Sequence, residues 1–504
     1  MPAIKKQKNQ NNEDSQKILK EQQTKTTATT VAEDKILSSS IIVNNNSDHS
    51  DNNDTVIKKE SSLSLKTRLN EQRKLRTNAR SENELKDILI ELKQIIADAH
   101  EELNDEIWNY AGLFLATLLL QQQEDDVTVS NLLYERGFLY RLSKDALTLC
   151  HDNCFIENPI LLPKNNYSKN NKIAAMAWDS VLPPDLLRSM QHAFDPKFNT
   201  TTGTKNNFWS AHDYSDGSAG TDPSPYFSYV LPITDNNTNN KHNDENTSTT
   251  VLERVIEILR QLVSQAYPQV LTKDCTAVEW WCHNRPPSSG HQLHFDSDDE
   301  GRGGVRNPIC STVLYLSSCK DGGETLITTQ SSTSTKLTEH NKSGWICSSK
   351  ENRLLTFAGN LLHGVIPGRP GVPSSSQQQQ QQLELSNNSN DCNNSSRRVT
   401  FMCAFWKKIH LQDDKLHHGA ARSFFGRVDG QEWAKPLLLL DNNQQNPKSS
   451  SVIINAKHGG CFYQIPTVWE DIDEKRNHQY KESLAHARKY GYLPPYDAFF
   501  QFYG

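Results

Sequence analysis

Regularly spaced hydrophobic side chains predict two helices in the first third of the chain. Between residues 81 and 122 these side chains recur every three or four positions, as along one face of an α-helix. Ser81 and Glu84 have the spacing of a capping box, which marks the start of the first helix, and the second is predicted from Glu106 to Gln122. We expect the two helices to pack as a hairpin or against a later domain, with the hydrophobic stripe as core.

The pattern changes to short strands after two further predicted helices. Pro183 and Pro184 precede a short helix that begins near Asp185, and an amphipathic helix is predicted from Val251 to Ala266. From Ala277 onward, β-branched and aromatic residues gather in short runs, which are VEWWCHN, STVLYLS, ETLITT, RLLTFA and RRVTFMCAFW. This succession predicts an α+β protein with an antiparallel sandwich or jelly roll, a double-stranded β-helix with flanking helices.

Composition divides the chain further. Residues 1–62 are polar with too few apolar side chains to offset the entropy of ordering the backbone, so they are predicted to form a disordered tail. A helical region follows at 63–163, and the jelly-roll domain spans 164–410 with a low-complexity insert at 374–396. A C-terminal extension at 411–504 has no feature that assigns it a role. The low hydrophobic share of 35% agrees with a chain that is only partly folded.

Charge and cysteine usage narrow the class of protein. The net charge of -6 shows no basic excess of the kind that binds nucleic acid. The ten cysteines are scattered, which is typical of reduced intracellular thiols, and Cys150 and Cys154 around His151 are interpreted as ordinary thiols. The start lacks the apolar core of a signal peptide, and the longest apolar run, Ala111–Leu120, is ten residues, about half a membrane span. We therefore expect a soluble protein of the cytoplasm or nucleus without a membrane partner.

A His-x-Asp tripeptide is the first candidate for metal chemistry. It occurs three times, at His49 and Asp51, at His242 and Asp244, and at His294 and Asp296. The first two lie in polar sequence that could not hold two ligands in fixed geometry. Only the third lies at the edge of a plausible strand, where side chains two positions apart point to the same face and can converge on one ion.

His363 is the predicted third ligand. It follows the strand RLLTFAG and a turn at Gly359 and Asn360, and another hydrophobic strand comes after it. The competing histidines are interpreted as surface residues; they are His340, His410, His417 and His418. Two histidines and one carboxylate on one face of a metal are the ligands of non-haem Fe(II) oxygenases, and they leave open positions for a 2-oxo acid and dioxygen.

A bound 2-oxo acid also needs a cation for its distal carboxylate, preferably a bidentate guanidinium. Arg398 opens a hydrophobic strand and is the candidate, with Thr400 on the same strand face to add a hydroxyl. Arg397 and Arg369 are rival cations. The alternative role for Arg398 is that of a strand-edge residue that only maintains solubility.

The motifs around the candidate ligands resemble those of a known family. The run HFDSDDEGRGGVRNPICSTVLYLSSCKDGGETLITT is similar to the core of the prolyl 4-hydroxylase-like 2-oxoglutarate oxygenases, which show an HxD, a charged loop, a strand ending in Tyr-Leu and a GGxT turn. Here these are His294–Asp296, Thr312–Leu316 and Gly322–Thr325. The resemblance covers residues 174–410, with the specific motifs inside 291–406.

The resemblance implies a chemistry. It implies Fe(II), 2-oxoglutarate as cosubstrate and ascorbate as a further cofactor. By the same resemblance, Tyr315 would form a hydrogen bond with 2-oxoglutarate, and a basic residue of the last strand would pair with the carboxylate of the cosubstrate. Dioxygen would hydroxylate a C–H bond, such as one in a prolyl residue of a protein or peptide, while 2-oxoglutarate is decarboxylated to succinate. The collagen-type enzymes carry lysine where this chain offers Arg398, which argues against a collagen-type substrate.

Two other functions are weighed against this one. A non-catalytic jelly-roll binding module would lack a ligand or the anchoring cation, but each has a candidate here. An oxygenase acting on nucleic acid would show a basic, aromatic-lined surface, for which only Arg285, Arg302 and Arg306 give support, and a small-molecule substrate is a further alternative. The aromatic segment 206–229 is either a lid over the pocket or a packed connection.

Overall fold

The computed structural model divides the chain into two units, Met1–Ser62 and Leu63–Gly504, and all described residues belong to the second. The described residues are 63–79, 81–122, 126–136, 138, 140–148, 155–156, 158–162, 172–196, 208–214, 227–233, 250–286, 288–297, 306–319, 322–332, 343–368, 397–409, 411, 421–423, 434–438, 456–458, 462–472 and 500–501. The predicted disordered tail, the insert at 374–396 and the Cys150, His151 and Cys154 group lie outside them.

The predicted helices are present, and the capping box is confirmed. The hydroxyl of Ser81 accepts from the N–H of Glu84, and the Glu84 carboxylate accepts from the N–H of Ser81. The helices of this region are α2 (Leu65–Asn78), α3 (Glu82–Glu101), α4 (Asp105–Gln121), α5 (Asp126–Glu135) and α6 (Lys144–Thr148). Helix α2 was not predicted because two of its buried positions are the polar residues Gln72 and Arg76.

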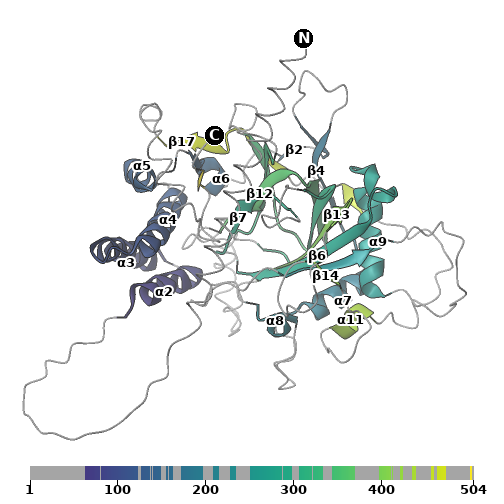
Figure 1. Cartoon of the computed structure of the whole chain (residues 1–504), viewed down its shortest axis with the longest axis horizontal. Helices are drawn as coiled ribbons and strands as arrows, with labels where there is room; N and C mark the ends of the chain where they lie inside the picture. The colour runs from purple at the N-terminus through teal and green to yellow at the C-terminus, as the bar shows by residue number, and fades with distance from the viewer. Residues whose placement is uncertain are drawn as a thin grey trace, which may run out of the picture. The chain divides into compact units, whose positions relative to one another are not determined.

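The hydrophobic stripe of α3 is core, as expected. Helices α3 and α4 pack together and lie on the side of strands β7 (His291–His294) and β12 (Leu361–Val365) (Figure 1). Both helices share one hydrophobic core with residues of the smaller β-sheet described below. The sheet residues in this core include Leu326, Ile346 and Leu362, and Ile366 directly after strand β12 joins them. The helices therefore cover the outer face of the sheet, and both expected arrangements, a hairpin and packing on the later domain, occur together.

Gly112 in α4 makes room for a buried arginine. The Arg136 guanidinium lies 3.8 Å over the Trp108 ring and donates to the carbonyls of Trp108 and Leu132, and a Cβ at Gly112 would overlap it. A Gly→Ala change inside a helix ordinarily stabilises by about 1 kcal/mol. For Gly112→Ala we expect instead a loss of about 1–3 kcal/mol in the free energy of unfolding, because the overlap displaces Arg136.

Urea unfolding measures this loss, with Asp87→Ala on the exposed face of α3 as the matched control for helix propensity. A Gly112→Ala variant as stable as the control would show that Arg136 moves aside without cost.

Two antiparallel sheets follow, as the strand pattern predicted. The larger sheet has the order β14-β5-β6-β13-β8-β11-β4-β15, with β3 paired to β4, and all its pairs except β5 with β14 are antiparallel. Its strands are β3 (Ile160–Leu161), β4 (Ile173–Asp179), β5 (Tyr229–Pro232), β6 (Ala277–Arg285), β8 (Cys310–Tyr315), β11 (Arg353–Ala358), β13 (Arg398–Trp406), β14 (Arg422–Ser423) and β15 (Lys457–His458).

The smaller sheet has the order β2-β16-β10-β9-β12-β7. Its strands are β2 (Phe155–Ile156), β7 (His291–His294), β9 (Thr325–Ser331), β10 (Gly344–Cys347), β12 (Leu361–Val365) and β16 (Phe462–Ile465). A third sheet joins β17 (Trp469–Asp471), β1 (Tyr140–Leu142) and β18 (Phe500–Gln501). The predicted C-terminal extension thus contributes strands to these sheets.

One hydrophobic core lies between the two larger sheets. It combines Val313, Tyr315, Leu355 and Met402 of the larger sheet with Ile327, Trp345, Leu361 and Phe462 of the smaller one. The other face of the larger sheet packs against α7 (Pro184–Ala193), α9 (Val251–Val263) and α11 (Lys435–Leu438). The remaining short elements are α8 (Phe208–Ala211) and the 3₁₀ helix Pro268–Leu271.

Two neighbouring tryptophans on β6 have their side chains on opposite faces of the larger sheet. Trp280 faces the helices and Trp281 faces the core between the sheets. Both are buried, so Trp281 is a core residue of the described structure. Among the residues that the structure describes, no helix combines the length and apolar character needed to cross a membrane.

Candidate metal centre

His294 and His363 lie opposite each other on neighbouring strands. Strand β7 pairs with β12 so that His294 faces His363, and paired residues of an antiparallel ladder point to the same face. Their ring centroids are 4.4 Å apart. The pairing of these two strands therefore brings together two histidines that are far apart in the sequence.

Strand alternation predicted that Asp296 lies on the same strand as His294, and the structure differs. Strand β7 ends at His294, so Asp296 lies beyond it. Its backbone carbonyl accepts from the Asn307 side chain at 2.7 Å, and its Oδ2 accepts from the hydroxyl of Ser311 on β8. The facing sheet thus holds the carboxylate in place.

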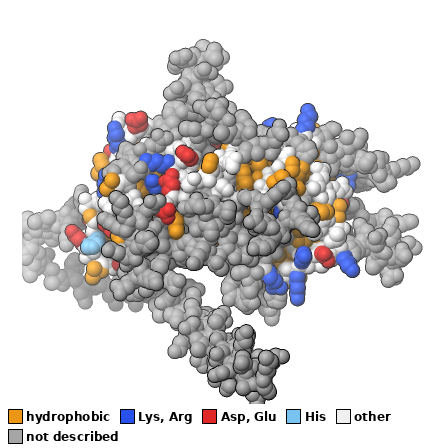
Figure 2. Space-filling view, turned by 90° about the horizontal axis from the view of Figure 1, so that it is seen from above, with side chains coloured by type: hydrophobic (Ala, Val, Ile, Leu, Met, Phe, Trp, Pro, Cys, Tyr) orange, Lys and Arg blue, Asp and Glu red, His pale blue; other side chains and the backbone are white. Residues whose placement is uncertain are grey.

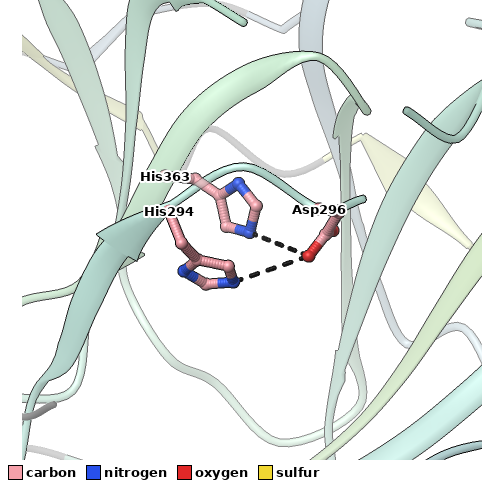
Figure 3. A group of neighbouring side chains, drawn as sticks. All are labelled: His294, Asp296 and His363. Atoms are coloured by element: carbon pink, nitrogen blue, oxygen red, sulfur yellow. Dashed lines mark ion pairs between the residues drawn. The ribbon is translucent and has the colours of Figure 1, made fainter. Parts of the chain in front are cut away.

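The three side chains converge on one small volume. Figure 3 shows both Nε2 atoms directed at the same carboxylate oxygen, Asp296 Oδ1, which lies 3.5 Å from His294 and 3.7 Å from His363. One candidate ligand atom from each residue lies within 4.8 Å of the others. Ligand atoms about 2.1 Å from a common ion lie roughly 3–3.5 Å apart, and the two distances from Asp296 Oδ1 to the imidazole nitrogens are close to this range.

Both imidazoles are oriented for metal binding. The Nδ1–H of His294 donates to the carbonyl of Gln292 at 2.9 Å, and that of His363 donates to the carbonyl of Leu361 at 3.0 Å. A histidine that donates from Nδ1 to a backbone carbonyl presents the Nε2 lone pair, and metal-binding histidines commonly have such a hydrogen bond. The donor set therefore fits a metal ion.

The electrostatics of the triad favour a carboxylate beside imidazole. Burial raises the pKa of Asp296, but the positive charge that His363 and His294 can carry and the Ser311 hydroxyl outweigh it and hold the pKa below its usual range. Burial lowers the pKa of His363 to about 4, so this imidazole is neutral near pH 7. For His294, burial lowers the pKa but bonding to Asp296 outweighs it and raises the pKa, so a metal ion would displace a proton there.

Ser311 is a residue that the sequence did not single out. Its hydroxyl donates to the candidate ligand Asp296, and loss of a hydrogen bond that orients a metal ligand lowers metal affinity by about 10–100-fold. We expect Ser311→Ala to weaken Fe(II) binding by about this factor while the protein stays folded. Anaerobic Fe(II) titration measures it, with Ser264→Ala on the exposed end of α9 as control. Equal affinity in both variants would show that Asp296 is positioned without Ser311.

Arg398 is buried on the facing sheet with little to neutralise it. Its side chain is only 2% exposed, and burial lowers its pKa. One nitrogen donates to the carbonyl of Gly323 at 3.2 Å, while Nε is buried without a hydrogen-bond partner. Within the described part of the chain, no carboxylate pairs with it. A buried cation in this state is costly unless an anion binds it.

The other predicted pocket residues lie beside Arg398. Thr400 pairs across the strands with Tyr315, and the Tyr315 hydroxyl shares a 2.7 Å hydrogen bond with Thr325. Gly323 has a φ of +83°, and a Cβ there would lie 2.9 Å from Arg398 Cδ. The GGxT turn singled out in the sequence is thus the place where the arginine side chain crosses close to backbone.

The rival residues divide into two groups. Arg397 donates to the side chain and the carbonyl of Asn284, so its guanidinium is engaged away from Arg398. Arg285 is buried and donates to the carbonyl of Gly290, which does not suit a surface that binds nucleic acid. Arg306 is exposed. The remaining rivals lie outside the described residues; they are Arg302, His340, Arg369, His410, His417 and His418.

Two further histidines lie beside the triad. The rings of His283 and His291 lie 5.2 Å apart, and His291 lies 4.8 Å from His294. Burial, then the charges of Arg285 and other groups including Arg398, lower the pKa of His283 well below its usual value, and Asp296 acts on it in the opposite direction. An irregularity in the β7–β12 pairing lets His291 and His294, three residues apart, adjoin each other. Strand alternation alone could not have found His291.

The aromatic segment 206–229 is described at its two ends. Trp209 and Phe227 are buried, and the indole N–H of Trp209 donates to the carbonyl of Phe194 at 3.1 Å. The Tyr214 hydroxyl accepts from the N–H of Asn284. These ends form a packed connection, the second of the two expected arrangements, and residues 215–226 between them are outside the described part.

No protein-family model and no curated protein matches the sequence. Solved structures do match. A prolyl-4-hydroxylase from Pseudomonas putida is 14% identical, with 46% of this chain and 92% of that one covered and a TM-score of 0.25. HygX from Streptomyces hygroscopicus, with nickel and 2-oxoglutarate bound, is 11% identical over 46% and 82%, with a TM-score of 0.23. A 2OG-Fe(II) oxygenase family oxidoreductase from Burkholderia pseudomallei is 12% identical over 34% and 60%, with a TM-score of 0.18.

The resemblance seen in the sequence thus extends to prolyl-4-hydroxylase and 2OG-Fe(II) oxygenase structures.

Proposed function

We propose that this chain is an Fe(II)- and 2-oxoglutarate-dependent oxygenase whose two facing sheets form a double-stranded β-helix. One observation carries the proposal: a His-Asp-His triad with converging ligand atoms lies in the same core as an arginine that no carboxylate of the described residues neutralises. A metal alone would account for the triad. A metal with an anionic, chelating cosubstrate accounts for the triad and for Arg398.

Each residue has a definite task in this proposal. His294, Asp296 and His363 bind the metal on one face and leave the opposite positions open. When bound, Fe(II) with 2-oxoglutarate supplies dioxygen activation, with release of succinate and carbon dioxide and hydroxylation of a C–H bond. Arg398 binds the distal carboxylate of 2-oxoglutarate with its unpaired Nε and a neighbouring nitrogen.

The pocket around the cosubstrate excludes water and limits its orientation. Tyr315 is fully buried, and burial raises the pKa of its hydroxyl, so the group stays a neutral hydrogen-bond donor. Its bond with Thr325 can be exchanged for one with a carboxylate of 2-oxoglutarate, and Thr400 offers a second hydroxyl beside it. The protein thus positions the reactants, and no side chain is needed as a general base.

The distribution of surface charges bears on the class of substrate. A residue of a protein or peptide is favoured over nucleic acid, because on the face seen in Figure 2 the described Lys and Arg side chains lie at several separate places with Asp and Glu nearby. Arginine rather than lysine on β13 argues against collagen-type prolyl hydroxylation. Ascorbate as a further cofactor, and the boundaries 63–163, 164–410 and 411–504, stay predictions from the sequence.

Anaerobic titration of the full chain with Fe(II) and then 2-oxoglutarate tests the proposal. We expect a visible charge-transfer band on addition of 2-oxoglutarate, and succinate formation once dioxygen is admitted. The His363→Ala variant, which loses one metal ligand, serves as control and should show neither. A folded wild-type protein without the band would instead favour the non-catalytic binding module.

A further inference from the structure

The last residue of α4 connects the helical region to the candidate site. Gln121 is 1% exposed, and its side-chain N–H donates to the carbonyl of Pro367 at 2.9 Å. Its side-chain oxygen accepts from Arg76 of α2 at 3.1 Å. Arginine can only donate and a carbonyl can only accept, so these partners determine which way the Gln121 amide points.

Pro367 belongs to the segment that follows the metal-binding strand. It lies four residues after His363, and its ring would be 2.9 Å from a Cβ at Gly290, directly before β7. The neighbouring Ile366 accepts from the N–H of Gly323 at 3.1 Å and donates to the carbonyl of Glu324 at 2.9 Å. The backbone held by Gln121 therefore also holds the GGxT turn.

The same turn carries Arg398. The Gly323 carbonyl accepts from the Arg398 guanidinium, and a Cβ at Gly323 would touch the Arg398 side chain. A continuous chain of short contacts thus runs from Arg76 through Gln121, Pro367, Ile366 and Gly323 to Arg398. Leu326, Leu362 and Ile366 belong to the hydrophobic core that the helical region shares with the smaller sheet.

From this chain of contacts we infer that Gln121 is a positioning residue for the 2-oxoglutarate pocket and that the helical region is part of the oxygenase site. The inference rests on the proposed function. Gln121 touches neither metal nor cosubstrate in this arrangement. It holds the backbone at 366–367, which in turn sets the place of Gly323 and hence of the Arg398 guanidinium.

Gln121→Glu separates the two contacts of this side chain. A carboxylate still accepts from Arg76, which keeps it ionised, but it cannot donate to Pro367 and repels that carbonyl. Loss of one buried hydrogen bond corresponds to about a 3- to 10-fold effect on an equilibrium. We expect the dissociation constant for 2-oxoglutarate to rise by about this factor while Fe(II) affinity stays unchanged.

Two measurements test the inference on the full chain, each with Gln94→Glu on the exposed face of α3 as the matched control. The first is the anaerobic titration, which separates the affinity for Fe(II) from that for 2-oxoglutarate. The second is hydrogen exchange without any ligand, in which the Gly323 amide should exchange faster in Gln121→Glu, whereas the amide of Leu355 on β11 should not change.

The two measurements together distinguish a failure of this inference from a failure of the proposed function. Wild-type protein that binds 2-oxoglutarate, with Gln121→Glu equal to the control in both measurements, overturns this inference and leaves the proposed function standing. Wild-type protein that binds Fe(II) but no 2-oxoglutarate overturns both. Equal losses of Fe(II) and 2-oxoglutarate affinity would show a general structural role for Gln121 and also overturn the inference. If Gln121→Glu does not fold, Gln121→Met removes the same donor without adding charge and replaces it in both measurements.

Discussion

The Asp296→Ala variant is expected to lose Fe(II) binding and turnover together. Asp296 Oδ1 is the one oxygen toward which both imidazoles point, so its removal takes away a ligand and the only negative charge of the triad. Loss of a residue that only hydrogen bonds to a metal ligand lowers metal affinity by about 10–100-fold, so loss of the ligand itself should lower it by more than about 100-fold. Anaerobic Fe(II) titration, followed by an assay for succinate, measures both effects.

Asp274→Ala is the matched control, because Asp274 is exposed and follows the 3₁₀ helix Pro268–Leu271. Asp296→Ala should keep the unfolding transition of the wild type, since two imidazoles beside a small side chain can remain neutral. Retention of wild-type Fe(II) affinity in a folded Asp296→Ala protein would rule out this triad as the metal site.

The Arg398→Ala variant is expected to bind Fe(II) normally and 2-oxoglutarate poorly. Removing one partner from a buried, hydrogen-bonded charge pair costs about 2–5 kcal/mol, which corresponds to at least about a 30-fold rise in the dissociation constant. The effect is this large because Arg398 is buried and offers an unpaired Nε. The charge-transfer titration with increasing 2-oxoglutarate measures it at fixed Fe(II).

Arg397→Ala is the control, since that neighbour bonds to Asn284. A larger loss of cosubstrate affinity in Arg397→Ala than in Arg398→Ala would move the anchor to Arg397, and no loss in either would move it to Arg369. Arg398→Met adds a second readout. Because it replaces a buried, uncompensated charge by an apolar side chain of similar length, we expect no loss of stability without ligand.

The sequence by itself determined the local features of this protein. Helical spacing and the Ser81 capping box placed α3, and the strand-rich runs placed β6, β8, β9, β11 and β13 to within a residue or two of their ends. These features depend on neighbouring residues and on which face of an element is buried, both of which sequence patterns express directly. The choice of His294, Asp296 and His363 as a set also came from local context.

Other features could not be predicted because they depend on residues far apart in the chain. Strand alternation was the wrong reason for placing Asp296, which lies beyond β7 and is held by Ser311 from the other sheet. The distinction between Arg398 and Arg397, adjacent in sequence, arises because one points toward the core and the other bonds to Asn284. Alternation of faces predicts that they differ, but not which partner each one meets.

Only the tertiary structure decided what the helical region contributes. Gln121 is the last residue of a strongly hydrophobic helix, and its spacing there gives no sign that it bonds to a carbonyl near His363. A buried polar group acquires its partner from whichever element packs against it, and that packing unites residues separated by most of the domain. The candidate metal ligands could therefore be chosen from the sequence, while the contacts that position them and the surroundings of Arg398 could not be predicted.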